Sequence, residues 1–207
     1  TSDSYQSYSK KIEWIQKEIR KGNFYQVNLS QQWTFSGEIS PFSSYLKLIK
    51  ENPTDFSAFL NCNDSYIISS SPELFLRKSG DTLESRPIKG TAPRGSSRQE
   101  DNLLRNALIS SEKDNSELLM ITDLIRNDLA KISIPGSVKV PDILHCESYT
   151  NVHHLVSTVK SKAIPSYHPV QLIQKSFPGG SITGCPKVRA VESIAYLEQR
   201  YRGIYTG

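Results

Sequence analysis

Apolar residues recur with a helical period near the start of the chain. Ile12, Ile15 and Ile19 fall on one face of a helix expected over residues 9–21. Gly22 follows this segment, and glycine is a common C-terminal cap residue. The pattern therefore predicts an amphipathic helix that ends at Gly22.

The next segments change to a strand-like period and then return to a helical one. Residues 24–35 place apolar side chains among Gln, Asn and Ser, which predicts an alternating strand. Ser40-Pro41 then predicts the start of a helix that runs to Asn52, with serine as the N-cap and proline in the first turn.

Short strands and helices follow without a regular alternation. The expected strands cover 56–61, 66–70, 74–78, 82–88, 136–139 and 146–160, with Ser79-Gly80-Asp81 as one turn; the expected helices cover 97–130 (two helices broken near Ser110-Ser111), 169–176 and 186–200. Residues 202–207 are expected to enter a further strand. Clusters of strands separated by helices predict an α+β protein with largely antiparallel sheets. No linker-like stretch divides the chain, so one domain over 1–207 is the simplest interpretation.

The composition restricts the classes of partner. Hydrophobic residues make up 37% and charged residues 22% of the 207 residues, which is typical of a globular protein with a substantial core. The net charge of +4 permits a small anionic ligand, but no basic run, zinc finger or phosphate-binding loop points to nucleic acid. The apolar runs are too short for a membrane span and the N-terminus has no signal-peptide pattern, so a cytoplasmic protein without a membrane partner is expected. Three widely spaced cysteines indicate neither a disulfide framework nor a zinc site.

The most informative segment is residues 87–91, Pro-Ile-Lys-Gly-Thr. A lysine has an ordinary pKa of about 10.4, so nucleophilic use of Lys89 requires burial or a cationic neighbour. Arg86 and Arg94 are near enough in sequence to supply positive charge. Glu73, on a neighbouring expected strand, is a candidate proton donor. The alternatives are a surface turn for Lys89 and a solvated strand end for Glu73.

Two carboxylates are candidates for a metal site. Asp114 and Glu117 are three residues apart on an expected helix and therefore share a face. Oxygen ligands suit Mg²⁺, and water, substrate or other residues would have to complete its coordination. A solvated helix face, with Asp114 as an N-cap, fits the same residues.

Two further segments carry candidate chemistry. His153 and His154 are consecutive in an expected strand, so at most one of them faces a given site, and His154 could transfer a proton or bind an anion, a structural role being the alternative. Residues 179–187, Gly-Gly-Ser-Ile-Thr-Gly-Cys-Pro-Lys, lead into an expected helix whose N-terminal N–H groups could face an anion. A glycine-rich turn that only starts the helix is the alternative.

Together these segments resemble the chorismate-utilising enzymes, a family that includes the large subunits of aminodeoxychorismate synthase and anthranilate synthase and isochorismate-forming relatives. The resemblance covers nearly the whole chain and rests on the order and spacing of residues 22–30, 71–73, 87–91, 113–129, 154–157 and 179–187. It implies an α+β fold of two orthogonally packed, mainly antiparallel sheets with helices on the outside, present here as a C-terminally incomplete domain.

The resemblance also implies a reaction. The lysine at position 89 is similar to that of aminodeoxychorismate synthases, where anthranilate synthases have alanine. It implies that Lys89 adds to C2 of chorismate while the C4 hydroxyl leaves, with Glu73 as general acid and Mg²⁺ on the ring carboxylate. Ammonia from a glutamine amidotransferase partner then attacks C4 and expels the lysine. The product is 4-amino-4-deoxychorismate, for para-aminobenzoate and folate biosynthesis.

The remaining site residues follow from the same resemblance. Glu117 is implied as a Mg²⁺ ligand, Asp114 as a further or water-mediated ligand, and His154 as a catalytic residue beside the reacting ring; the substrate pocket is assigned to Gly90, Thr91, Gly180, Ser181 and Thr183. The family pattern extends beyond both ends of this sequence, so the 207 residues alone are expected to be inactive. Anthranilate synthase component I and a non-catalytic chorismate-binding domain stay open as alternatives.

Overall fold

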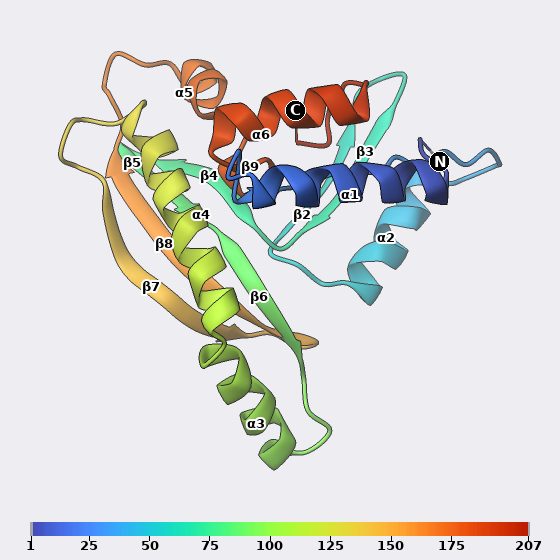
Figure 1. Cartoon of the computed structure of the whole chain (residues 1–207), viewed down its shortest axis with the longest axis horizontal. Coiled ribbons are helices and arrows are strands. Elements are labelled where there is room, and N and C mark those ends of the chain that lie inside the picture. Colours follow the sequence, from blue (N-terminus) through green and yellow to red (C-terminus); the bar gives the residue numbers. More distant parts are fainter. Residues whose placement is uncertain (1, 207) are drawn as a thin grey trace. The chain divides into compact units, whose positions relative to one another are not determined.

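The computed structural model describes residues 2–206 and has the expected α+β composition with antiparallel sheets (Figure 1). The helices are α1 (Tyr5–Arg20), α2 (Pro41–Glu51), α3 (Arg98–Ile109), α4 (Glu112–Ala130), α5 (Pro169–Ser176) and α6 (Lys187–Glu198), with a short 3₁₀ helix η1 (Gly180–Ile182). The strands are β1 (Gln26–Val27), β2 (Phe56–Asn61), β3 (Tyr66–Ser71), β4 (Leu74–Ser79), β5 (Thr82–Arg86), β6 (Ile88–Pro93), β7 (Lys139–Ser148), β8 (Val152–Lys162) and β9 (Gly184–Cys185). None of the helices in residues 2–206 combines the length and the apolar character that a membrane span requires.

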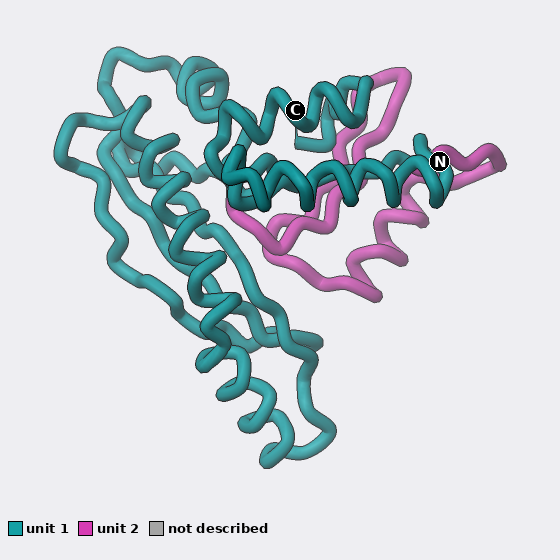
Figure 2. The backbone as a smooth tube through the Cα atoms, viewed as in Figure 1, with its two compact units in different colours: residues 1–32, 75–207 teal, residues 33–74 magenta. Residues whose placement is uncertain are grey.

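The chain forms two compact units, residues 1–32 with 75–207 and residues 33–74 (Figure 2). The smaller unit consists of α2 and the antiparallel β2–β3 hairpin. Its apolar contacts are mostly aromatic: Phe59 on β2 lies 5.4 Å from Phe42 and 5.6 Å from Tyr45 of α2, between ring centroids. Aromatic side chains thus hold the helix against the hairpin.

The larger unit is organised around a five-stranded sheet with the path β4-β5-β8-β6, in which β7 also pairs with β8. Helix α4 covers one face of this sheet, here called the helix face. The main core is made of buried apolar side chains from α4, α5, the sheet and the residues that flank them, namely Leu83, Ile121, Leu124, Ile125, Leu129, Ile132, Val159, Ala163 and Leu172. A second buried cluster includes Leu118 of α4, Leu155 of β8 and Leu108 of α3.

A second layer of the larger unit joins the two ends of the chain. Gln26 and Val27 of β1 pair with Cys185 and Gly184 of β9. Ile15 of α1, Phe24 and Leu197 of α6 form a separate buried cluster. This layer holds the glycine-rich segment from the side away from α4.

The cap residues confirm several predicted boundaries. After α1, the N–H of Gly22 bonds to the carbonyl of Ile19 and the N–H of Asn23 to that of Glu18, with Gly22 at φ +77°. This is the Schellman arrangement that glycine favours. Ser40 caps α2, and α5 matches its predicted range. Ser97 and Ser111 cap α3 and α4, so the break near residues 110–111 is confirmed.

Four expectations were wrong in part. Only Gln26–Val27 of the predicted strand 24–35 lies in a ladder, because Asn28 and Ser30 bond instead to Thr183 and Glu198. Residues 202–206 form turns rather than a strand, and Gly207 lies outside the described residues. The strands expected over 136–139 and 146–160 are instead β7 and β8, which are separated by a turn at residues 149–151, and residues 140–145 of β7 were not predicted. The segment after residue 88 continues as strand β6 through Pro93.

Candidate functional site

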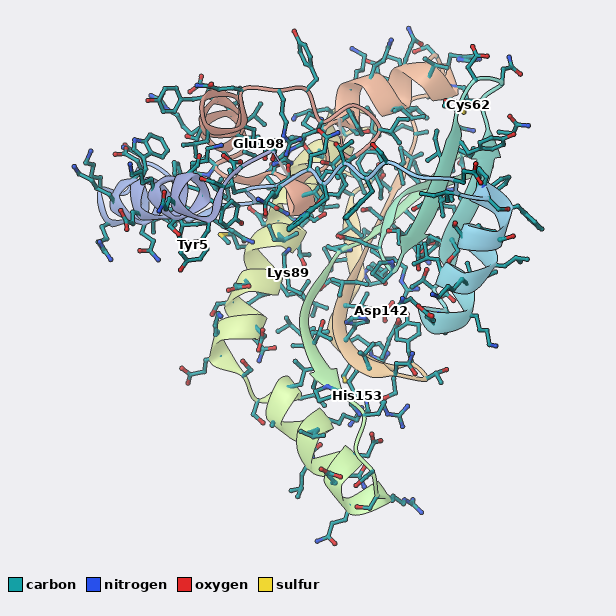
Figure 3. The ribbon with its side chains drawn as sticks, turned by 90° about the vertical axis from the view of Figure 1, so that its right-hand side faces the viewer. Tyr5, Cys62, Lys89, Asp142, His153 and Glu198 are labelled. Carbon is teal, nitrogen blue, oxygen red and sulfur yellow. The ribbon has the colours of Figure 1, made fainter. Side chains whose placement is uncertain are left out.

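Lys89 lies within strand β6 and not in a surface turn. It pairs with Leu155 of β8, a fully buried core residue, so its side chain lies on the helix face of the sheet. Its Nζ donates a hydrogen bond to the carbonyl oxygen of Ser181 at 3.3 Å, and Figure 3 shows it beside α4. The lysine is half-buried. The strand therefore presents one amine to the glycine-rich segment.

Gly90 is the extra residue of a bulge in β6. The register shifts between Lys89 and Thr91, and Gly90 has φ +79°. A Cβ atom at this position would lie 2.9 Å from Cβ of Asp114 on α4. Glycine is therefore required both by the left-handed backbone and by the close approach of the helix. The bulge also places Thr91 on the sheet face opposite to Lys89.

His154 pairs with Thr91 on that opposite face. Thr91 Oγ1 and His154 Nδ1 are 2.9 Å apart, so the hydroxyl fixes one edge of the imidazole ring. Burial lowers the pKa of His154, while a backbone hydrogen bond at Gly90 and the charge of Glu147 oppose this shift. His153 points the other way and is fully buried, with hydrogen bonds to Ser148 and Asp101. The structure thus confirms that only one of the two histidines is available to this face.

The structure brings the catalytic candidates together as two pairs. Lys89 contacts Ser181 on the helix face, and Thr91 contacts His154 on the other face. Only Gly90 separates the two pairs along β6, which is the last strand on the sheet's path. A single substrate that meets both pairs has to lie across the edge of β6.

The two candidate metal ligands lie on the first turns of α4. Ser111 is the N-cap, which excludes the alternative that Asp114 is the N-cap; Asp114 instead accepts a hydrogen bond from the Ser111 hydroxyl. Glu117 lies 3.9 Å from Nζ of Lys113; its side chain is partly exposed and that of Lys113 is largely exposed. Within residues 2–206 no group of three or more His, Cys, Asp or Glu could hold a metal ion. The two carboxylates fit the oxygen chemistry of Mg²⁺, whose other ligands would be water, substrate or further residues.

The glycine-rich segment does not lead straight into a helix. It first forms η1 and the short strand β9, and α6 then begins at Lys187, so the prediction that residues 179–187 lead into a helix is confirmed. Gly180 packs against α4, where a Cβ would lie 2.7 Å from Leu124 Cδ2. The Thr183 hydroxyl is buried and donates to the carbonyl of Gly179 at 3.0 Å. Thr183 therefore bonds within the glycine-rich segment, whereas the carbonyl of Ser181 accepts the hydrogen bond from Lys89.

Glu73 lies in the smaller unit, between β3 and β4. Its N–H bonds to the Ser71 hydroxyl at 3.3 Å, which fixes this short connection. Lys89 belongs to the larger unit, so the assignment of Glu73 as proton donor to Lys89 stays a prediction.

The expected positive field around Lys89 is not supplied by the two neighbouring arginines. Arg86 is paired with Glu147, and Arg94 with Asp101 at 2.7 Å. Arg94 Nε and Nη2 bond both oxygens of Asp101, and these bonds lower the pKa of that carboxyl. Each guanidinium is therefore neutralised by its own carboxylate.

Sequence reasoning missed a buried ionic network behind the glycine-rich segment. The Glu198 carboxylate accepts from the N–H of Ser30 at 2.7 Å and from Arg202 Nη2 at 2.7 Å. Arg202 also donates to the carbonyls of Ile182 at 2.8 Å and Asn28 at 2.6 Å. Glu198 and Arg202 are four residues apart, but their partners Asn28, Ser30 and Ile182 are distant in sequence, so no local pattern connects the whole network. Their role here is to fix the position of the segment that carries Ser181.

A second missed contact lies at the start of α6. Lys187 Nζ is 2.9 Å from both carboxylate oxygens of Asp128 on α4 and 3.3 Å from the carbonyl of Ser176. Burial lowers the pKa of Lys187, and its hydrogen bond to the Asp128 carboxylate opposes that shift. The ion pair holds the glycine-rich segment between α4 and α6.

Comparisons with known proteins point to one family. The sequence matches the family model of chorismate binding enzymes over residues 1–207. It is 44% identical over 200 residues to aminodeoxychorismate synthase component 1 of Salmonella typhimurium, covering 97% of this chain and 44% of the relative. It is 39% identical over 203 residues to anthranilate synthase component 1 of Saccharolobus solfataricus, covering 97% of this chain and 48% of the relative.

A solved structure has the same arrangement of elements. The fold superimposes on anthranilate synthase component I from Streptococcus pneumoniae with a TM-score of 0.88 and 31% identity, over 99% of this chain and 45% of that chain. The chain therefore spans a little less than half the length of the relatives that it matches.

Proposed function

This chain belongs to the family of chorismate-binding enzymes, and on that premise we propose that it carries the lysine-bearing part of an aminodeoxychorismate synthase. The reaction replaces the C4 hydroxyl of chorismate with an amino group taken from ammonia. The 44% identity to an aminodeoxychorismate synthase component 1 supports this choice within the family.

The observation that carries the proposal is the placement of Lys89. Its amine is half-buried on β6 and 3.3 Å from the carbonyl of Ser181, beside the helix that bears Asp114 and Glu117. The acceptor fixes the side chain in one direction, which favours attack at a defined ring carbon.

The proposed chemistry has two displacements. The neutral amine of Lys89 forms a bond to C2 of chorismate, the ring double bonds shift, and the C4 hydroxyl leaves as water after it takes a proton from Glu73. Ammonia then forms a bond to C4, the double bonds shift back, and the C2–N bond to Lys89 breaks. The enolpyruvyl ether stays intact, and the lysine is regenerated.

The other candidate residues act on charge and orientation. Asp114 and Glu117 are the residues that would hold Mg²⁺, which when bound supplies positive charge to the substrate carboxylate. His154, fixed by Thr91, is available to hold or transfer a proton from the opposite face. Ammonia is proposed to come from a glutamine amidotransferase partner, in keeping with the designation component 1 of the relative.

The proposal is tested with the full-length protein supplied with chorismate, Mg²⁺ and ammonium. We expect 4-amino-4-deoxychorismate by liquid chromatography with mass detection; fluorescent anthranilate as the main product would refute the proposal. Lys89→Ala should abolish a covalent adduct seen by intact-protein mass spectrometry. Lys160→Ala is the matched control, because Lys160 lies on β8 and is paired with Glu84, and the adduct should persist in it.

A second candidate function is anthranilate synthesis, in which ammonia attacks C2 and pyruvate is eliminated. The TM-score of 0.88 to an anthranilate synthase component I favours it. The lysine at position 89 argues against it, because the C2 attack by ammonia needs no nucleophile from the protein. The product assay above separates the two functions.

A further inference from the structure

His154 is the middle residue of a row that crosses three strands. Thr91 of β6 pairs with His154 of β8, and His154 pairs with Glu147 of β7. Paired residues of neighbouring antiparallel strands share one face, so all three side chains lie on the sheet face opposite α4. A polar pocket of about 280 Å³ on this face includes Arg86 and Glu147 in its lining. The row is therefore continuous with a hollow in the sheet surface.

Both carboxylate oxygens of Glu147 have partners. Oε1 forms an ion pair with the Arg86 guanidinium, and Oε2 accepts a hydrogen bond from the Tyr149 hydroxyl at 2.7 Å. Arg86 and Glu147 are each about one quarter exposed, at 24% and 23%. A carboxylate held at both oxygens has little freedom to rotate, and it fixes the hydroxyl end of Tyr149.

The ring of Tyr149 continues this contact to His154. The two rings meet edge to face, with centroids 5.7 Å apart and an interplanar angle of 61°. On its other side His154 is held by the Thr91 hydroxyl at 2.9 Å. The imidazole ring is thus confined between Thr91 and Tyr149, and the position of Tyr149 depends on Glu147.

The charged and titratable groups that face His154 are few. From β6 it meets the Thr91 hydroxyl and the Gly90 backbone; from β7 and the turn after it, Glu147 and Tyr149. Arg86 of β5 is paired with Glu147. Burial lowers the pKa of His154 and the negative charge of Glu147 raises it, so removal of that charge should lower the pKa further.

We propose that Glu147, acting through Tyr149, is a positioning residue that orients the imidazole ring of His154 for proton transfer. The part of this proposal that concerns catalysis rests on the proposed function. The part that concerns ring orientation does not, because it can be measured without turnover.

The test is a pH titration of histidine ring signals by NMR in the full-length protein, with His154 assigned by loss of its signal in His154→Gln. Glu147→Gln should lower the titration midpoint of His154 and weaken the nuclear Overhauser contacts between the His154 and Tyr149 rings. Tyr149→Phe keeps the ring but removes its hydroxyl, so it should weaken the ring contacts with a smaller change in midpoint.

Two controls separate positioning from a general loss of structure. Glu84→Gln removes another carboxylate on the same sheet face, one that pairs with Lys160 at 3.8 Å, and should leave His154 unchanged. The ring signals of His168, which caps α5, should keep the same chemical shifts at a fixed pH in all variants. If Glu147→Gln leaves the His154 midpoint and ring contacts as they are, or changes them no more than Glu84→Gln does, the proposal is wrong.

An activity measurement tests whether the orientation of His154 by Glu147 contributes to catalysis. Glu147→Gln should lower kcat for chorismate at least tenfold with KM within about twofold, because orientation matters most in the transition state. An unchanged kcat would overturn the catalytic role. If no amination product forms in the unmodified protein either, the proposed function fails while the NMR result still decides the orientation.

Discussion

Arg202 donates a hydrogen bond from Nη1 to the carbonyl oxygen of Ile182 at 2.8 Å, and its charge is balanced by the buried carboxylate of Glu198. Ile182 is adjacent to Ser181, whose carbonyl accepts from Lys89. The position of the candidate nucleophile's partner thus depends on an ion pair that lies outside the site.

The first prediction concerns this ion pair. Arg202→Ala leaves Glu198 buried at 1% side-chain exposure without its main counter-charge, so the free energy of unfolding should fall by about 3–5 kcal/mol. Urea unfolding followed by circular dichroism measures it. Arg189→Ala is the matched control on α6, since its pair with Glu192 is exposed at 71% and 58% and should contribute less than about 1 kcal/mol. Equal losses of unfolding free energy in the two variants would contradict a stabilising role of the buried Arg202–Glu198 pair.

The second prediction is a pH dependence that originates at Glu198. Burial raises the pKa of this carboxyl, but hydrogen bonds from Arg202 and Ser30 outweigh it, so the pKa is lowered from its ordinary value of 4.5. A lowered folded-state pKa means that the ionised group stabilises the fold above pH 4.5 and that this contribution is lost as the pH falls below that value. The free energy of unfolding of Glu198→Gln should therefore depend less on pH between pH 5 and pH 3 than that of the unmodified protein. Parallel pH profiles would exclude Glu198 as the source.

The third prediction concerns the bulge in β6. Gly90→Ala introduces a Cβ 2.9 Å from Cβ of Asp114 at a backbone φ of +79°. Gly136 has nearly the same angle, φ +78°, with nothing within 4 Å of its Cβ position, so Gly136→Ala measures the backbone cost alone. We expect about 1 kcal/mol of destabilisation for Gly136→Ala and a further 1–3 kcal/mol or so for Gly90→Ala, from thermal unfolding. Equal losses would mean that α4 moves aside at no cost.

The fourth prediction compares the two lysines that contact Asp128. Lys187 is 14% exposed and bonds both carboxylate oxygens, whereas Lys131 is 55% exposed and bonds one at 3.1 Å. Lys187→Met should cost about 3 kcal/mol of unfolding free energy, and Lys131→Met less than about 1 kcal/mol. Chemical denaturation of both variants measures the difference. A larger loss in Lys131→Met would show that the exposed lysine is the main partner.

Local signals in the sequence were sufficient to predict that the helices form. Ser40, Ser97 and Ser111 accept hydrogen bonds from N–H groups of the first turn, as serine at these positions predicts. The middle of strand β7, residues 140–145, was missed because its alternation is interrupted. Its register shifts twice between Lys139 and His145, and Leu144 has φ +52°. Such irregular strands are specified by their partner β8, which no local window contains.

The candidate site was predictable only in part. Lys89, Asp114, Glu117 and His154 were singled out from motifs whose order along the chain is distinctive. That Lys89 and Thr91 lie on opposite sheet faces follows from one bulge, and bulges have no reliable sequence signature apart from a glycine.

The residues around these motifs were missed for a related reason. Glu147, Arg202 and Glu198 contact the site through pairings of distant segments. Such pairings are set by tertiary register and not by spacing along the chain.

The edge of β6 has a consequence for solubility. In the part of the chain that the structure describes, β6 is the last strand on the sheet's path, and an unprotected edge of this kind can pair with another molecule. Pro87 precedes the strand, Pro93 ends it, and Gly90 interrupts its ladder. Prolines and bulges are two of the devices by which natural sheets prevent intermolecular pairing. The same backbone irregularity that separates Lys89 from Thr91 therefore also protects this edge against aggregation.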